Sequence, residues 1–377
     1  AAVGGPDLEV PAEARVVDLA GRTLMPGLID CHAHVNAHSA NLPGLADESP
    51  AYVALLAANE MRAMLHRGFT TVRDPGGADF GLHEAVAQGI VDGPRLYFGG
   101  KALSQTGGHG DGRPRGRSVR DDHQCCPDMS TVCDGVDEVR RAAREQLRTG
   151  AHHVKIMLSG GVASPTDRID STQFSLEEIR AIVEEAEAAN RYVAGHAYTA
   201  RAINRGLEAG VRSIEHGNLL DESSVELFLE RDAFLVPTLV TYDRMAAEGA
   251  EHGLPEASLA KNPLVLDAGL KALDLAHRAG VNLCYGSDLL GGMRRHQLRE
   301  FTIRGAVQPA ADVIRSATVT AARLLGEDGR LGRIVPGALA DMLVLDGDPL
   351  EDLAVLTDPE ERLKMVVQGG AVKLDRL

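Results

Sequence analysis

Two histidines spaced two residues apart end a short apolar run near the start of the chain. His32 and His34 close the run at residues 28–34, which has the composition of a strand. Side chains alternate between the two faces of a strand, so these imidazoles point the same way and can share one cation. An isolated His-x-His can also be an ordinary polar strand end, so the rest of the chain must decide between the two readings.

Four more side chains with ligand chemistry lie where other apolar runs end: Lys155, His196, His216 and Asp288. Imidazoles and carboxylates bind divalent metal ions, so together with the His-x-His pair they predict a metal site. Each has a plainer alternative. The two histidines can be hydrogen-bonded core residues, the aspartate can cap a helix, and the lysine can be partly buried and paired with an acid.

These side chains meet only if the apolar runs are parallel strands of one sheet. Eight runs are rich in Val, Ile and Leu, as in strands buried on both faces, and they cover residues 28–34, 70–74, 94–99, 153–159, 192–197, 213–217, 234–239 and 282–288. Helical patterns lie between them at residues 137–147, 200–208 and 223–229, and another opens with a capping box at Ser175. Eight such units predict an α/β fold, a (β/α)₈ TIM barrel with catalytic groups at the carboxyl ends of its strands.

The two ends of the chain differ from the central part, because they have the sequence pattern of short alternating strands joined by turns. We expect residues 1–25 and 331–377 to pair into one small β-domain beside a barrel formed by residues 26–330. The long segment 113–134 is polar and irregular, and it is either a lid or a surface excursion.

Composition excludes several classes of partner. The net charge of −15 argues against nucleic acid and against an anionic membrane surface, and no apolar run is long enough for a membrane span. Five cysteines without paired spacing predict a reducing, cytoplasmic location and no disulfide framework. A zinc knuckle of Cys125, Cys126 and Cys133 is conceivable, but adjacent cysteines chelate poorly.

Together, the motifs resemble those of the amidohydrolase superfamily along nearly the whole chain. They are PGLIDCHAH at 26–34, VKIM at 154–157, GHA at 195–197, IEHG at 214–217, GSD at 286–288 and GRIVPGALAD at 332–341. The last motif resembles the segment in which chains of this family re-enter a β-sandwich built from both chain ends. The resemblance therefore implies that the terminal β-domain is a split β-sandwich.

The resemblance implies a two-metal site. In it His32, His34 and Asp288 would hold the more buried ion, and His196 and His216 the more exposed one. Lys155, carboxylated by CO₂, would bridge both ions, because a carbamate is anionic and bidentate whereas an ammonium is repelled by two dications. Such ligands suit Zn²⁺, and Co²⁺ or Mn²⁺ also fit. A hydroxide between the metals would attack the substrate carbonyl, and Asp288 would accept its proton and pass it to the leaving amine.

A narrower resemblance is to the dipeptidase and carboxypeptidase-like branch that includes prolidase. It is carried by residues 104–111, 158–165 and 196–199. By that likeness His109 and Tyr198 would donate hydrogen bonds to the developing oxyanion; the alternative for His109 is a solvated residue of a glycine-rich turn. In the loop after the eighth strand, Arg295 is our candidate to bind a peptide carboxylate, although a solvated helix face is the plainer reading.

The expected activity is hydrolysis of an amide bond in dipeptides such as Xaa-Pro, or of the C-terminal residue of short peptides. The alternative substrates are non-peptide amides, carbamates, ureas or N-acyl amino acids, including xenobiotics, at the same metal site. A silent scaffold would lack some ligands, and none is missing. A single-metal deaminase needs no bridging lysine, so Lys155 argues against it. We expect a homo-oligomer acting on a small molecule or dipeptide.

Overall fold

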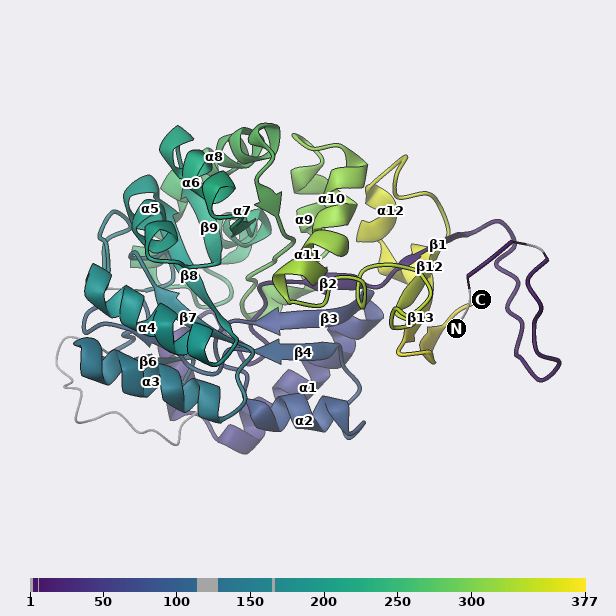
Figure 1. Ribbon diagram of the computed structural model, residues 1–377, viewed down its shortest axis with the longest axis horizontal. Helices are drawn as coiled ribbons and strands as arrows, with labels where there is room; N and C mark the ends of the chain where they lie inside the picture. Colours follow the sequence, from purple (N-terminus) through teal and green to yellow (C-terminus); the bar gives the residue numbers. More distant parts are fainter. Residues whose placement is uncertain (1–2, 6, 114–127, 165–166) are drawn as a thin grey trace.

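A computed structural model describes residues 3–5, 7–113, 128–164 and 167–377. Parallel strands form its centre and helices cover them (Figure 1). In this central part the strands are β2 (Leu28–Asp30), β3 (Phe69–Asp74), β4 (Arg95–Phe98), β5 (Ala102–Ser104), β6 (Ser130–Val132), β7 (His153–Met157), β8 (Tyr192–Thr199), β9 (Ser213–Leu219), β10 (Phe234–Val236) and β11 (Asn282–Leu283). All eight predicted strands are present, and the short strands β5 and β6 were not predicted.

The central strands form two parallel sheets. One has the order β11-β10-β9-β8-β7-β5-β6 and the other β2-β3-β4. Backbone hydrogen bonds join the two sheets at two places. The His152 amide, just before β7, donates to the Phe98 carbonyl at the end of β4 (2.9 Å), and the Cys31 amide, just after β2, donates to the Tyr285 carbonyl beyond β11 (2.8 Å). The carboxyl ends of strands from both sheets therefore face one region.

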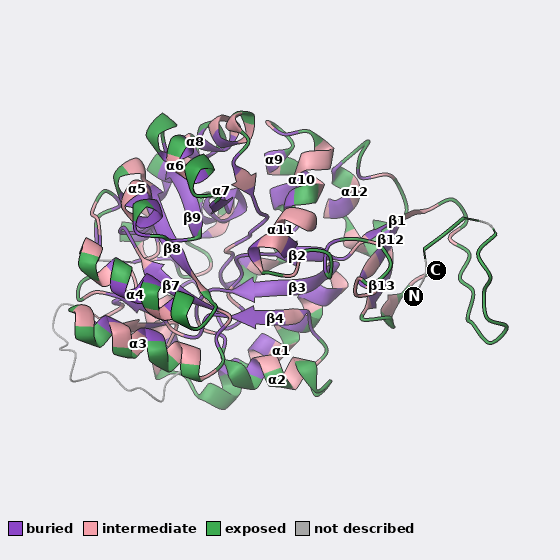
Figure 2. Ribbon diagram, viewed as in Figure 1, coloured by how far each residue is buried: buried purple, intermediate pink, exposed green. Residues whose placement is uncertain are grey.

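The helices lie outside the sheets, with their exposed faces turned to solvent (Figure 2). In chain order they are α1 (Pro50–His66), α2 (Phe80–Ala87), α3 (Val136–Arg148), α4 (Leu176–Ala188), α5 (Ala200–Glu208), α6 (Glu222–Glu230), α7 (Leu239–Glu248), α8 (Glu256–Ala279), α9 (Arg299–Arg304), α10 (Ala310–Ser316), α11 (Val319–Leu324), α12 (Ala354–Thr357) and α13 (Pro359–Arg362), with 3₁₀ turns at Leu42–Asp47 and Gly291–His296. The four predicted helices correspond to α3, α4, α5 and α6. The capping box of α4 is confirmed, since Ser175 and Glu178 bond each other's backbone amides.

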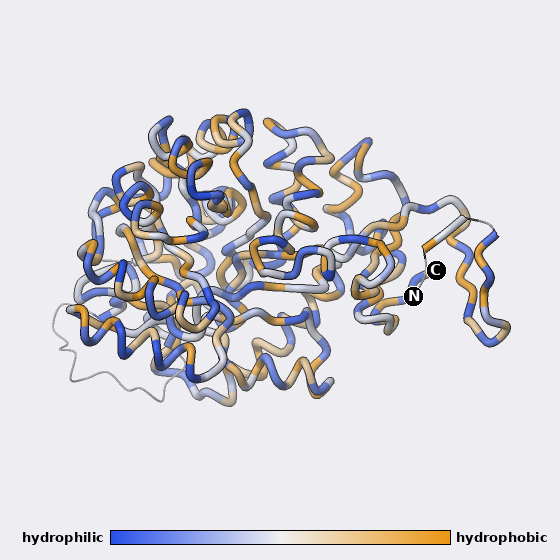
Figure 3. Tube along the Cα trace, in the orientation of Figure 1, coloured by the Kyte–Doolittle hydropathy of each residue, from blue (hydrophilic) through white to orange (hydrophobic). Residues whose placement is uncertain are grey.

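The main core lies between the strands and these helices. Ile156 of β7, Ile214 of β9, Ile182 of α4 and Ile203 of α5 are all completely buried in one cluster. Along the helical segments, hydrophobic and hydrophilic residues alternate (Figure 3), as expected where one face packs on a sheet. This packing fixes the strands that carry the candidate ligands.

A separate antiparallel sheet unites the two ends of the chain. Its order is β1 (Thr23–Pro26), β12 (Met342–Leu345), β13 (Leu363–Gln368) and β14 (Ala371–Asp375). The strand character expected earlier in residues 1–25 is absent from the described residues before Thr23, which project from the body (Figure 1). No helix in the described ranges has both the length and the apolar character needed to cross a bilayer.

Candidate active site

One cavity gathers nearly all the side chains that the sequence singled out. It is lined by the six predicted metal ligands and by the two predicted oxyanion donors: His32, His34, Lys155, His196, His216, Asp288, His109 and Tyr198. These residues lie on, or in the segments after, different strands, so the arrangement depends on the tertiary fold and not on local sequence.

A buried carboxylate fixes the two segments that carry His32 and Asp288. Asp30 Oδ1 accepts from the His32 amide (2.9 Å) and the Ser287 amide (3.2 Å), and its Oδ2 accepts from Ser287 Oγ (2.6 Å) and Gln297 Nε2 (2.8 Å). The Asp288 amide in turn donates to the His32 carbonyl at 2.7 Å. The segments after β2 and after β11 are therefore held in one register.

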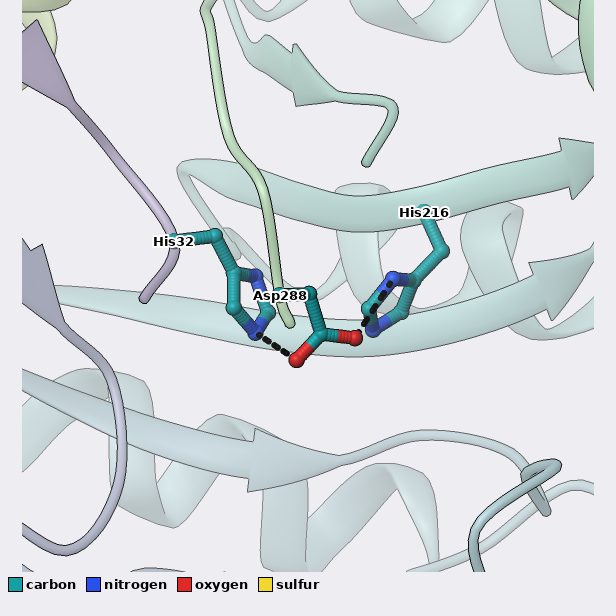
Figure 4. A group of neighbouring side chains, drawn as sticks. All are labelled: His32, His216 and Asp288. Carbon is teal, nitrogen blue, oxygen red and sulfur yellow. Dashed lines mark ion pairs between the residues drawn. The ribbon is translucent and has the colours of Figure 1, made fainter. Parts of the chain in front are cut away.

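Asp288 lies between three of the imidazoles. Its Oδ1 is 3.4 Å from His32 Nε2 and 3.2 Å from His34 Nε2, and its Oδ2 is 3.8 Å from His216 Nδ1. Ligand atoms of His32, His216 and Asp288 all fall within 4.8 Å of one another (Figure 4). Asp288 (φ 51°) and His216 (φ 74°) have left-handed backbones, a costly conformation for such residues that concentrates at functional sites.

Each of the four imidazoles has one ring nitrogen engaged with a protein oxygen. The contacts are His32 Nδ1 to Glu215 Oε2 (2.7 Å), His34 Nδ1 to the Gly76 carbonyl (2.8 Å), His216 Nδ1 to Thr238 Oγ1 (2.8 Å) and His196 Nε2 to the Gly160 carbonyl (3.2 Å). This leaves the second nitrogen of each ring for another partner. Histidines that bind metals are oriented in this way, so the donor set fits divalent cations.

Glu215 of β9 and Arg73 of β3 support the cluster from the buried interior between the strands, and sequence reasoning assigned neither a role. Both are completely buried, and Arg73 Nη2 donates to both carboxylate oxygens of Glu215 at 2.7 Å. Burial raises the pKa of Glu215, but Arg73, Lys155 and His32 outweigh it and hold that pKa well below its usual range. The available signal was a charged residue inside each of two strands whose residues are all or nearly all buried.

Lys155 is buried on β7, and no carboxylate among the described residues forms an ion pair with it. Burial, with a smaller contribution from Arg73, lowers the pKa of its amine to about 8, against the opposing effect of Glu215. The plainer alternative for this residue, a lysine paired with an acid, therefore finds no support in the described part of the chain.

Tyr198 and His109 flank the imidazoles. The Tyr198 ring lies 4.9 Å from that of His196 and 5.4 Å from that of His216, and its hydroxyl accepts from Tyr242 Oη at 3.0 Å. Burial raises the pKa of Tyr198, so it keeps its proton. His109 stacks on His196 at 4.2 Å with an interplanar angle of 20°, and is not the solvated turn residue of the alternative reading.

Comparison with known proteins decides the family. The model of the amidohydrolase family matches residues 23–372. The chain belongs to the amidohydrolase family. It is thus a hydrolase of carbon–nitrogen bonds, in a family that is typically metal-dependent, and the resemblance predicted from its motifs is confirmed.

Individual relatives indicate which branch of the family this amidohydrolase belongs to. Ochratoxinase of Aspergillus niger is 36% identical over 362 residues, covering 92% of this chain and 75% of ochratoxinase. A solved prolidase complexed with N-methylphosphonate-L-proline is 51% identical with a TM-score of 0.94, covering 97% of this chain and 90% of the prolidase. A solved Xaa-Pro dipeptidase with bound methionine is 31% identical with a TM-score of 0.81, covering 93% of this chain and 86% of the dipeptidase. The chain lies in the prolidase-like branch of the family.

The prediction for Arg295 needs correction. In this amidohydrolase its side chain is exposed and does not line the cavity, because it pairs with Glu248 of α7 and donates to the Gly292 carbonyl at 2.7 Å. The partner lies far away in sequence, so the basic loop alone could not reveal the pairing.

Two sequence-based hypotheses fall wholly or partly outside the described residues. Cys125 and Cys126 of the conceivable zinc knuckle lie in the range 114–127, outside the described residues, as does most of the segment 113–134 considered as a lid. Cys133, the third member, is buried with a free thiol, as are Cys31 and Cys284.

Proposed function

We propose that this amidohydrolase cleaves the peptide bond of Xaa-Pro dipeptides, or of a C-terminal residue in short peptides, at a two-metal centre. The observation that carries the proposal is the convergence of four imidazoles, one carboxylate and one buried lysine on a single cavity. The 51% identity to a prolidase bound by a phosphonate analogue of a proline peptide supports the choice of substrate.

In this proposal His32, His34 and Asp288 hold the more buried ion and His196 and His216 the other. Zn²⁺ is our first choice for the metal, with Co²⁺ or Mn²⁺ as alternatives, because the donors are imidazole nitrogens and carboxylate oxygens. When bound, such ions lower the pKa of a water molecule and polarise a substrate carbonyl.

Lys155 is proposed to carry a carboxylate derived from CO₂ and to bridge the two ions. The depressed pKa of the amine, about 8, supports this because only a neutral amine attacks CO₂. Carbamate formation joins the lysine nitrogen to the CO₂ carbon and releases one proton, which leaves an anion where a cation would be repelled.

The remaining steps use protein groups. Asp288 accepts the proton of the attacking water and returns it to the leaving nitrogen, which avoids expelling an amide anion. Its position between three imidazoles, at 3.2–3.8 Å, supports this role. Tyr198, with its proton retained and its hydroxyl group oriented by Tyr242, donates to the developing oxyanion.

Apolar side chains of the cavity support a small hydrophobic leaving group such as proline. Leu42, Pro43, Val162, Met245 and Leu290 line the same space as the candidate ligands. The similarity to ochratoxinase favours one alternative, a non-peptide amide or N-acyl amino acid cleaved at the same centre.

An activity screen with measured metal content tests the proposal. Enzyme loaded with Zn²⁺, Co²⁺ or Mn²⁺ is offered Xaa-Pro dipeptides, other dipeptides, N-acyl amino acids and aryl amides. We expect Xaa-Pro dipeptides to give the highest kcat/KM, two metal ions per chain, and a loss of at least about a hundredfold in Asp288→Asn. Preference for N-acyl amino acids would select the alternative, and one metal per chain would contradict the two-metal centre.

We also propose that the two parallel sheets form one closed (β/α)₈ TIM barrel over residues 26–330, with residues 1–25 and 331–377 building a split β-sandwich domain. The backbone hydrogen bonds that join the two parallel sheets, and the pairing of β1 with β12, support this division. An experimental structure with an open seam between β4 and β7, or between β2 and β11, would contradict it.

A further inference from the structure

A second cleft lies at the other end of the parallel strands from the candidate metal ligands. It has a volume of about 530 Å³, and its lining includes Arg95 at the start of β4, His152 just before β7, Tyr192 at the start of β8 and Arg212 just before β9. The candidate metal ligands lie further along β7, β8 and β9, and the two cavities share no lining residue. The proposed hydrolysis gives this cleft no role.

The cleft is positively charged although the protein as a whole carries a net charge of −15. Three arginines and one carboxylate line it: Arg95, Arg191, Arg212 and Glu327. Arg95 and Glu327 are each compensated by a charged partner at 2.8 Å. Arg191 and Arg212 form no ion pair with a carboxylate in the part of the chain that the structure describes. Two positive charges therefore remain available to a ligand.

The guanidinium group of Arg212 is held in place by its neighbours. Its central carbon lies 5.8 Å from the ring centre of Tyr192 and 5.2 Å from that of Phe234. Its Nη2 donates to the Arg323 carbonyl at 3.3 Å. A ligand that binds a side chain already ordered in this way causes a smaller loss of side-chain entropy than one that binds a free arginine.

His152 adds a neutral donor to the same cleft. Its Nδ1 accepts from the Phe98 amide at 3.2 Å. Burial, together with His83 and Arg191, lowers the pKa of His152 to about 4. At neutral pH the ring therefore carries one proton, and that proton is on Nε2. Within the described ranges Nε2 has no hydrogen-bond partner, so it is free to donate to an anion.

Aromatic side chains line the cleft beside these donors. The rings of Tyr97 and His152 lie 4.9 Å apart, and Tyr192 stacks on the buried ring of His153 at 5.5 Å and 16°. The volume is that of a site for a small organic molecule and is too large for an inorganic ion alone. Guanidinium groups bind phosphate through paired hydrogen bonds, and a phosphate monoester carries about −1.5 to −2 charges at pH 7.

We propose that this cleft binds an organic phosphate monoester with a planar ring. Arg191 and Arg212 bind the phosphate, His152 Nε2 donates to it, and the ring packs against Tyr97 and Tyr192. The site is separate from the metal-ligand cavity, so the inference holds whichever amide the enzyme cleaves.

Calorimetric titration of the zinc-loaded enzyme tests the chemistry of the ligand. Adenosine monophosphate has a ring and a phosphate, inorganic phosphate has only the charge, and adenosine has only the ring. We expect adenosine monophosphate to bind at least about tenfold more tightly than either of the others, because only it uses both parts of the cleft. Absence of its binding at millimolar concentration overturns the site. Equal affinity for inorganic phosphate overturns the role of the rings, and equal affinity for adenosine overturns that of the arginines.

Substitutions locate the binding. Arg191→Glu and Arg212→Gln should each weaken the binding of adenosine monophosphate by at least about tenfold, the usual effect of losing a charged hydrogen bond. Arg191 is exposed, so its replacement should leave the fold intact, and melting temperatures check this in every variant.

Arg180→Glu is the matched control, because it makes the same change of net charge on the exposed side of α4. We expect its affinity for adenosine monophosphate to equal that of the wild type. Equal weakening in Arg180→Glu and Arg191→Glu would reduce the effect to net charge and overturn the proposal. Wild-type affinity in both cleft variants would place the phosphate elsewhere, such as at the metal centre, and would overturn it as well.

Discussion

At the scale of single residues, the candidate centre depends on partners that orient its histidines. His32 is hydrogen-bonded to Glu215, and Glu215 to Arg73, so a chain of buried groups runs from the His32 ring into the core. Ligand types at strand ends could be predicted from sequence because strand periodicity dictates which side chains share a face. The supporting pair could not, because Arg73 and Glu215 meet only through tertiary packing.

Replacement of Glu215 with Gln tests this support. We expect metal affinity to fall by about 10- to 100-fold, because the amide no longer provides an anionic acceptor for His32 and leaves Arg73 without its counter-ion. Competition with a chelator measures the affinity, and chemical denaturation reports the accompanying loss of stability. Glu226→Gln on the exposed face of α6 is the control. Metal affinity equal to wild type would refute the orienting role.

The pKa of Lys155 predicts how carboxylation depends on pH. The amine is neutral only above its pKa, so in metal-free enzyme the uptake of CO₂ should rise with pH and level off above about 8. An ordinary lysine would continue to gain reactivity until about pH 10.4. Carbamate formation from ¹³C-bicarbonate is measured by ¹³C NMR, with Lys155→Gln as the blank. A rise that continues past pH 10 would contradict the lowered pKa.

At the scale of elements, strand positions were predictable and strand ends were not. Predicted runs 28–34 and 282–288 contain only β2 (Leu28–Asp30) and β11 (Asn282–Leu283), because ladder pairing stops before the ligands. Beyond those points, the bonds of Asp30 and of the Asp288 amide hold the chain. Arg295 was misjudged because its partner Glu248 comes from another helix.

The capping box of α4 allows a prediction confined to one element. Ser175→Ala removes the acceptor for the Glu178 amide, now 3.2 Å from Ser175 Oγ. We expect the free energy of unfolding to fall by about 1 kcal/mol, with kcat/KM unchanged, because α4 carries no ligand. Urea denaturation and kinetics measure the two quantities. Ser175→Asp, another good N-cap residue, should retain the stability; equal loss in both variants would argue against capping as the cause.

At the scale of the whole molecule, ion binding should stabilise the folded protein as well as activate the enzyme. The candidate ligands follow β2 and β11 or lie on β7, β8 and β9, so bound ions would tie both parallel sheets together. Removal with a chelator should lower the melting temperature, and re-addition of zinc at about 100 times Kd should restore about 2.7 kcal/mol per site. Scanning calorimetry measures this. Asp288→Asn should show a smaller shift, and equal shifts in both proteins would place the stabilising ions elsewhere.

The pairing of β1 with β12 also has a consequence for synthesis. Thr23–Pro26 leaves the ribosome long before its hydrogen-bonding partner Met342–Leu345, because the central strands and helices lie between them in the sequence. Until then the nascent chain presents an unpaired strand edge, the type of surface on which aggregation begins. Premature termination before Met342 would make this edge permanent, so truncated products should be insoluble or chaperone-bound even though the ligand-bearing strands are complete.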